Sequence, residues 1–250
     1  MNDRPIDVWD LATFDAELVA VLEANAHLIR NYMARDPEIF RTYELATGHE
    51  RALTRPSNAF ATDFAALKEA LALEMQARTI RAWHYTRLTD SEAAALKSSG
   101  VVISTPDSLR TRLSTRVAAG DFDQTVADQL FMASPFHSDQ LGARSNKFWM
   151  TSHPIAIDDS GVEPLMARWG GEVASFWLKD AGLLTTLTGV GRRCIVELAS
   201  STGADPPRLF RCRRRRRHLR PELGVYPQQA GLRPICHFRP ADFRSPRNPY

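Results

Sequence analysis

The sequence predicts an α+β protein in which helices come first and short strands follow. Three observations indicate this class. Apolar residues recur at helical spacing through the N-terminal third, the pattern changes to alternation at Thr79, and short β-like runs are then dispersed among helical segments. We expect a helical N-terminal lead-in over 1–78, an α+β ligand-binding domain over 79–204 and an irregular basic tail over 205–250.

The N-terminal third shows apolar residues at three- and four-residue steps, which predicts a helix that carries Phe14, Leu18, Val21, Leu22 and Ile29. We expect this helix to end at Asp36, because a proline at position 37 pushes the preceding residue out of the α region. A short second helix is expected around Phe40. A third, rich in Ala, Leu and Glu, is expected from Thr62 or Asp63, either of which can cap it.

From Thr79 the run TIRAWHYT predicts a strand, with alternate residues on opposite faces. A helix capped by Thr89 or Asp90 follows and ends at Gly100, and Val101–Ser104 is expected to form a second short strand. Further on, the pattern predicts helices over 106–134 with an interruption near Gly120, and then a loop over 136–145. The remaining expected elements are a strand at 147–151, a helical turn at 163–168, strand or helix at 172–178, a helix at 180–188 and a strand at 193–199.

Composition excludes several classes of protein. No apolar window approaches the length of a membrane span, and the N-terminus lacks the basic and apolar regions of a secretory signal. The 3 cysteines match no zinc pattern, and the 7 histidines show no HExxH spacing, so we expect a cytoplasmic protein without a metal site. Phosphate-binding glycine motifs and the GxSxG elbow are absent from the sequence.

The net charge of +3 conceals a sharp asymmetry along the chain. Residues 205–250 contain 12 Arg and 3 acidic residues, whereas residues 1–204 contain 20 basic and 26 acidic side chains. Three interpretations of the tail stay open: a basic arm that binds nucleic acid or an acidic lipid surface, a solvated tail without a partner, or out-of-frame translation of GC-rich DNA.

Two constellations carry chemistry. In the first, His84 and Thr86 share one face of a predicted strand, and Arg87 stands where that strand turns into a helix start, an arrangement suited to phosphate or pyrophosphate. The alternative is a satisfied histidine, with Arg87 paired to Asp90 or Glu92.

The second constellation is Trp169-Gly170-Gly171-Glu172. It offers an aromatic plate, backbone that a ligand can approach closely, and a carboxylate. The alternative is a glycine turn beside a packed indole. A third segment, 146–153, presents Trp149 and Thr151 on one face of a predicted strand, where core packing is the common explanation.

The segments W-H-Y-T-R-L-T-D-x-E and W-G-G-E resemble a group of small bacterial proteins that carry H-x-T-R-L and G-G-E segments at similar separation. At a coarser level the layout, over about residues 79–200, resembles the ADP-ribosyltransferase-like fold. That resemblance implies a split sheet of short mixed or antiparallel strands. On it His84 matches the first-strand His, Trp149 or Thr151 falls at the second-strand position, and Glu172 or its rival Glu197 supplies the acid.

The resemblance further implies that NAD is the dinucleotide substrate. His84 and Thr86 would hold the ribose or amide end, Arg87 the pyrophosphate, and an aromatic residue the nicotinamide. The implied activity is ADP-ribosyl transfer to protein, nucleic acid or water, as in a bacterial toxin or defence effector. Two alternatives remain open: a non-catalytic nucleic-acid-associated protein that binds through its basic tail, and another nucleotide-binding or hydrolytic domain.

Overall fold

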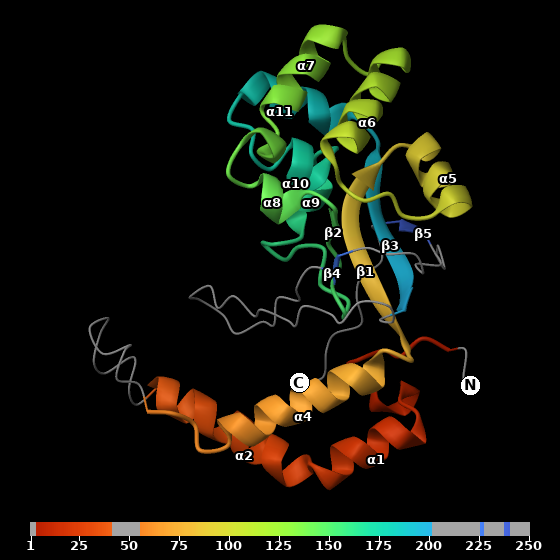
Figure 1. The fold of residues 1–250 in the computed structure, drawn as a ribbon. Coiled ribbons are helices and arrows are strands. Elements are labelled where there is room, and N and C mark those ends of the chain that lie inside the picture. Colours follow the sequence, from red (N-terminus) through yellow and green to blue (C-terminus); the bar gives the residue numbers. More distant parts are fainter. Residues whose placement is uncertain (1–3, 42–55, 202–225, 228–237, 241–250) are drawn as a thin grey trace. The chain divides into compact units, whose positions relative to one another are not determined.

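The computed structural model describes residues 4–41, 56–201, 226–227 and 238–240 (Figure 1). Helices come first and strands follow in no regular alternation with helices, so the predicted α+β class is confirmed. The described residues form two compact units, one up to Thr79 and one from Ile80 onward. Each unit is described by itself below. The expected helix around Phe40 falls largely outside the described residues, as does most of the tail.

The N-terminal unit is helical. It contains a 3-10 turn at Leu11–Thr13, α1 (Ala16–Ala24), α2 (Ala26–Ile39) and α4 (Ala61–Met75). The side chain of Asp15 caps α1 by accepting from Leu18 N at 2.9 Å, and it also forms an ion pair of 2.6 Å with Arg78. Helices α2 and α4 are joined by Tyr32 and Phe64, whose stacked rings lie 3.9 Å apart.

Two boundary predictions in this unit are wrong. Pro37 lies inside α2 rather than after its end. It stands in the last turn of the helix, where the missing amide costs one hydrogen bond and the chain can still close on Phe40. Helix α4 begins at Ala61 after Phe60, without a side-chain cap, so neither Thr62 nor Asp63 has the expected role.

The second unit is built on β1 (Thr79–Leu88), which confirms the predicted strand. Its three-stranded sheet has the order β1-β3-β5, with β3 at Arg192–Ser201 and β5 at Phe238–Pro240. Strands β1 and β3 run in opposite directions (Figure 1). Strand β5 is antiparallel to β3, with Ile195 opposite Arg239. A β-carbon on Gly191, whose φ is +65°, would lie 2.6 Å from the Leu88 carbonyl, so this junction requires glycine.

A second, two-stranded sheet pairs β2 (Lys147–Phe148) with β4 (Tyr226–Pro227) in antiparallel register. The strand expected at 101–104 is wrong except for Ser104, which forms an isolated bridge with Lys147. The strand expected at 147–151 is shorter than predicted, although Thr151 forms a bridge with Trp83 of β1. The segment after β2 therefore lies along the side of β1.

Among the described residues of the second unit, more lie in helices than in strands. The predicted helices at 90–98, 106–134, 163–168 and 180–188 are all present, and the predicted loop contains a 3-10 turn (Pro135–His137) and α8. Their bounds are α5 (Asp90–Ser99), α6 (Pro106–Ala118), α7 (Gln124–Met132), α8 (Leu141–Arg144), α9 (Glu163–Ala167), α10 (Gly171–Ala174) and α11 (Ala181–Gly189).

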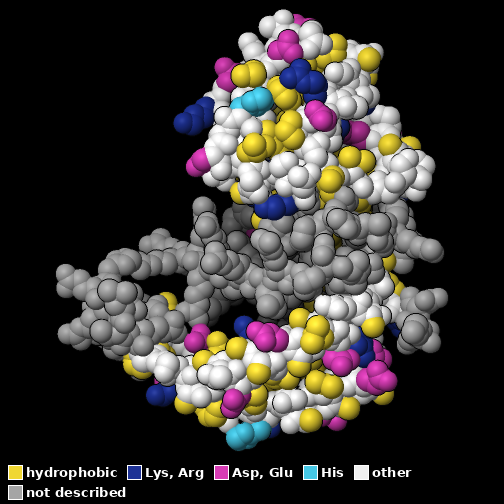
Figure 2. Space-filling model, viewed as in Figure 1, with side chains coloured by type: hydrophobic (Ala, Val, Ile, Leu, Met, Phe, Trp, Pro, Cys, Tyr) yellow, Lys and Arg dark blue, Asp and Glu magenta, His cyan; other side chains and the backbone are white. Residues whose placement is uncertain are grey.

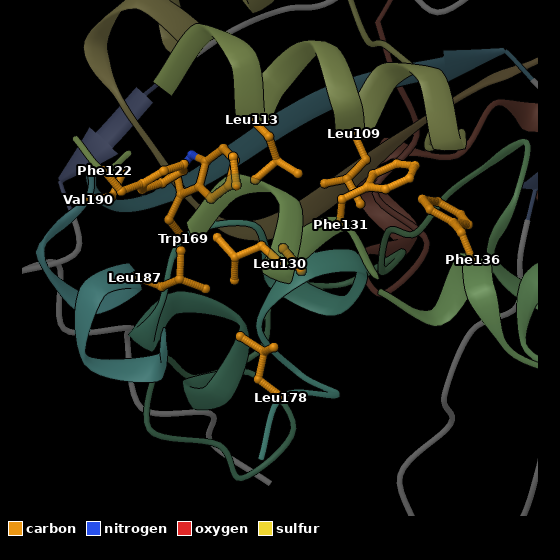
Figure 3. Packing of buried hydrophobic residues seen from close by; sticks show 12 residues of the cluster. Leu109, Leu113, Phe122, Leu130, Phe131, Phe136, Trp169, Leu178, Leu187 and Val190 are labelled. Carbon is orange, nitrogen blue, oxygen red and sulfur yellow. The ribbon is translucent and has the colours of Figure 1, made fainter. Parts of the chain in front are cut away.

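Two apolar clusters hold the second unit together. The larger joins α6, α7, α10 and α11 around the fully buried Trp169, with Leu109, Leu130 and Leu187 among its members (Figure 3). The smaller packs Trp83 and Tyr85 of β1 against Val162 and Met166. Since these β1 residues stand at odd positions, one face of the strand is covered by α9 and the segment before it.

The surface of the described residues is mixed in character. Charged side chains of both signs lie among apolar ones on the face that Figure 2 shows. Among the described residues, no helix is both long enough and apolar enough to cross a membrane.

Candidate functional site

His84 lies on the even face of β1, and its ring contacts the segment that follows β2. Its Nδ1 is 2.7 Å from the Trp149 carbonyl oxygen, and its ring centroid is 4.3 Å from that of Phe148. Because a carbonyl oxygen can only accept, Nδ1 carries the proton. Burial lowers the pKa of His84 to about 4. The charge of Arg112 also lowers this pKa, whereas the hydrogen bond to Trp149 raises it. The ring is therefore neutral at pH 7, with Nε2 as its acceptor.

Trp149 and Thr151 follow β2 and lie next to β1. Thr151 is held there by two backbone hydrogen bonds of 2.8 Å with Trp83, and its hydroxyl donates to His153 O. The indole of Trp149 lies under the guanidinium of Arg144, with 5.3 Å from Cζ to the ring centroid. The Trp149 indole N–H is buried and has no acceptor in the described part of the chain.

Glu172 lies in the first turn of α10 and pairs with the same arginine. Arg144 Nη1 is 3.0 Å from Glu172 Oε1, and the two side chains are only 16% and 27% exposed. Burial raises the pKa of Glu172, and Arg144 opposes that rise. The guanidinium also lies 5.7 Å from the Trp177 ring centroid.

These contacts define what we call the Arg144 cluster, which consists of His84, Arg144, Phe148, Trp149, Glu172 and Trp177. It contains three of the sequence-predicted residues, His84, Trp149 and Glu172, which are linked in series. The His84 imidazole donates a hydrogen bond to the backbone carbonyl of Trp149. Glu172 forms an ion pair with Arg144, whose guanidinium lies over the Trp149 ring. The arrangement combines a neutral imidazole, an aromatic surface and a partly buried carboxylate with a paired cation.

Trp169 is not the stacking plate that the sequence predicted. Its side chain is fully buried in the larger apolar cluster, edge-on to Phe122 at 6.2 Å (Figure 3). Its indole N–H donates to Glu92 at 2.8 Å. A residue with no exposed surface cannot meet a ligand ring, so the alternative prediction of a packed indole is confirmed.

The two glycines serve the turn that leads to Glu172. Gly170 has a φ of +87°, and a β-carbon there would lie 2.3 Å from Ala174 Cβ. Gly171 has a φ of +54° with open space around it. Close packing on α10 therefore accounts for Gly170, while Gly171 leaves room on its exposed side.

Thr86 and Arg87 do not form the predicted phosphate site. Thr86 is buried, and Arg87 donates through Nε to Val190 O at 2.7 Å, which fastens the start of β3 to the end of β1. The start of α5 carries a capping box, in which Glu92 N donates to Thr89 Oγ1. The alternative pairing of Arg87 with Asp90 or Glu92 is also wrong, since Asp90 pairs with Arg192 and Glu92 with Arg112.

Glu197 lies away from His84. Its carboxylate is 4.0 Å from the guanidinium of Arg81 on β1. Successive strand residues point to opposite faces, so a residue that meets Arg81 stands on the face opposite His84. Of the two candidate acids, Glu172 is linked to Trp149 through Arg144, and Glu197 lies beside Arg81 on the odd face of β1.

Sequence reasoning missed Arg144 and Trp177. Arg144 falls in a segment without periodicity that predicted only a loop, and it forms the short helix α8. The sequence offers one indication of its role, which is its position shortly before the aromatic residues Phe148 and Trp149. Trp177 was visible only as one more aromatic residue after Glu172.

No protein-family model, no curated protein and no solved structure matches this chain. No group of three metal-ligating side chains occurs within the described ranges. The predicted nucleic-acid contact through the basic tail concerns residues that lie almost entirely outside those ranges.

Proposed function

We propose that this chain is an NAD-consuming enzyme of the ADP-ribosyltransferase type, with its reaction centre at the Arg144 cluster. One observation supports the proposal: His84 of the first strand donates to the backbone of Trp149, whose indole lies under Arg144, and Arg144 pairs with Glu172 of a distant turn. A reaction that separates charge on a ribose ring needs an acid, an aromatic surface and a hydrogen-bonding group in such proximity.

The chemistry assigned to each residue follows from its state. In the proposed step the bond between nicotinamide nitrogen and ribose C1′ breaks, and its electron pair leaves with nicotinamide. In its ionised form, which Arg144 favours, the Glu172 carboxylate stabilises the positive charge that develops on the ribose. The neutral His84 accepts a hydrogen bond from a ribose hydroxyl through Nε2. An acceptor group, or water, then bonds to C1′ and loses a proton.

Two hydrogen-bond donors of the Arg144 cluster have no acceptor among the described residues. Arg144 Nε and Trp149 Nε1 are both buried and lack hydrogen-bond partners among the described residues. A buried donor without an acceptor costs about 1–3 kcal/mol. Phosphate or carboxamide oxygens of a dinucleotide could accept from both donors once the side chains that cover these two buried atoms move aside.

The test is nicotinamide release from NAD by the purified full chain, with and without added protein or nucleic-acid acceptors. We expect Glu172→Gln to lower the rate by about 100-fold or more, the scale of losing one preorganised electrostatic group. Glu197→Gln, with its partner on the other face, is the matched control and should stay within a few-fold of wild type. Nicotinamide release that depends on Glu197 and not on Glu172, or no release with any acceptor, would overturn the proposal.

The same two donors also suit another phosphorylated ligand, as in a nucleotide-binding or hydrolytic domain. Calorimetric titration with ADP-ribose and with NAD separates the two functions. Binding of both ligands without nicotinamide release would favour the non-transferase alternative.

A further inference from the structure

A second polar centre lies outside the Arg144 cluster, at Glu92 of α5. One carboxylate oxygen of Glu92 accepts from Thr89 N at 3.0 Å and from Trp169 Nε1 at 2.8 Å. The other accepts from Arg112 Nε of α6 at 2.9 Å. The Glu92 side chain is 15% exposed. One buried carboxylate therefore ties together the start of α5, the middle of α6 and the indole of Trp169.

Trp169 is the fixed end of the turn that carries Glu172. Its amide donates to Leu187 O at 3.0 Å, and its side chain is fully buried. Only the two glycines with positive φ separate it from Glu172. Glycines have the widest backbone freedom, so the direction of this turn depends on what anchors it before Gly170. The hydrogen bond to Glu92 is the polar part of that anchor.

Arg112 connects Glu92 with Trp169 and also acts on His84, a member of the Arg144 cluster. Its guanidinium lies 4.7 Å from the Trp169 ring centroid while it pairs with Glu92. Its charge is also felt by the His84 imidazole. Glu92 thus pairs with a cation that packs on the Trp169 ring and lowers the pKa of His84.

We propose that Glu92 is a positioning residue, which through Trp169 and Arg112 fixes where the Glu172 carboxylate stands relative to His84. The catalytic meaning of this position rests on the proposed function, because it takes Glu172 as the acid. The contacts themselves do not depend on that function. Within the described ranges, the hydrogen bonds and ion pairs of Glu92 go to Thr89, Arg112 and Trp169, so its effect on Glu172 passes through the Trp169 turn.

The test uses Glu92→Gln and Glu92→Ala, with Asp90→Asn as the matched control. Asp90 lies in the same helical turn, but its side chain is 85% exposed and pairs with Arg192. Glu92→Gln keeps a carbonyl oxygen for Trp169 and for the capping box, and it loses the charge and the acceptor for Arg112. It therefore protects the experiment against a variant that fails to fold. Glu92→Ala loses both the hydrogen-bond acceptors and the charge.

NMR of the full chain reads the turn directly. We expect Glu92→Ala to shift the Trp169 indole N–H and the Gly170 and Gly171 amide signals, and to increase their hydrogen-exchange rates about tenfold or more. Glu92→Gln should give smaller shifts of the same signals, and Asp90→Asn should leave them in place. If Glu92→Ala leaves both glycine amides unchanged, the positioning role is overturned.

Kinetics then separate the two proposals. If the wild type releases nicotinamide, Glu92→Ala should lower kcat about tenfold to 100-fold with KM nearly unchanged, as expected when a reacting group is displaced but the ligand still binds. The glycine signals can shift in Glu92→Ala even if the wild type never releases nicotinamide. That result would support the positioning role of Glu92 and contradict the proposed function. An unchanged kcat in an active Glu92→Ala enzyme would overturn the positioning role.

Discussion

Arg144 Nη1 lies 3.0 Å from Glu172 Oε1, so the only acid of the candidate site is paired with a cation that also covers Trp149. Burial alone would favour the neutral carboxyl group, and the guanidinium favours the ionised one. Their balance decides whether Glu172 is charged near neutral pH. Arg144 therefore controls the ionisation state on which the proposed chemistry depends.

Replacing Arg144 with Ala should raise the pKa of Glu172 beyond its already raised position, because burial would remain while the opposing charge is removed. Carboxyl ¹³C NMR titration of the variant measures this directly. In an active enzyme the acid limb of the kcat profile should move to higher pH by the same amount. Arg144→Lys, which keeps a charge, should move it less. A Glu172 pKa that falls in Arg144→Ala would contradict the pairing.

His84 provides a second pH-dependent prediction. Its pKa is lowered to about 4 in the folded chain, against about 6.5 in an unfolded one. Below about pH 6.5 the unfolded state binds a proton that the folded state refuses, so stability should fall between about pH 6.5 and 4 by up to about 3 kcal/mol.

The measurement for His84 is the urea midpoint of wild type and of His84→Asn at pH 7 and at pH 4.5. Asn can still donate to the Trp149 carbonyl but does not titrate, so the variant should lose less stability on acidification. His27→Asn, at an exposed position on α2, is the control and should follow wild type. Identical acid sensitivity in wild type and His84→Asn would show that the imidazole is not buried.

Local patterns predicted much of this fold, and their successes share a cause. The strand at 79–88 and the helix after it were predictable because alternation, the Thr89 cap and the Glu92 capping box act over a few neighbouring residues. Pro37 shows the limit of such rules, since α2 continues through it to Ile39 although proline cannot donate to the carbonyl four residues before it.

The site was predictable only in part, because its defining contacts join distant segments. His84, Trp149 and Glu172 could be named from their residue types, but Arg144, which connects two of them, carries no local signal. Conversely, the sequence Trp169-Gly170-Gly171 predicted an aromatic side chain that a ligand could contact. Its burial depends on helices α6, α7 and α11, whose packing no local pattern contains.

The turn before Glu172 gives a stability prediction with a built-in control. Gly170→Ala should destabilise the chain by about 3 kcal/mol, because a left-handed backbone and a close contact with Ala174 combine. Gly171→Ala has the same sign of φ but open space, and should cost about 1 kcal/mol. Urea denaturation with comparable m-values measures both. Equal costs at the two positions would show that the contact with Ala174 relaxes freely.

The N-terminal unit yields a prediction that is independent of any function. The hydrogen bond from Arg78 lowers the pKa of Asp15 to about 2. A lowered carboxyl pKa means that the ion pair contributes fully above about pH 4 and that this contribution is lost as the pH falls toward 2. Asp15→Asn keeps an N-cap for α1 and removes the charge, so it should be less stable than wild type at pH 7 but nearly equal to it at pH 2.

Urea midpoints followed by helical circular dichroism check this, with the exposed Asp63→Asn on α4 as control. If the difference between wild type and Asp15→Asn is the same at both pH values, the pair with Arg78 contributes nothing to stability.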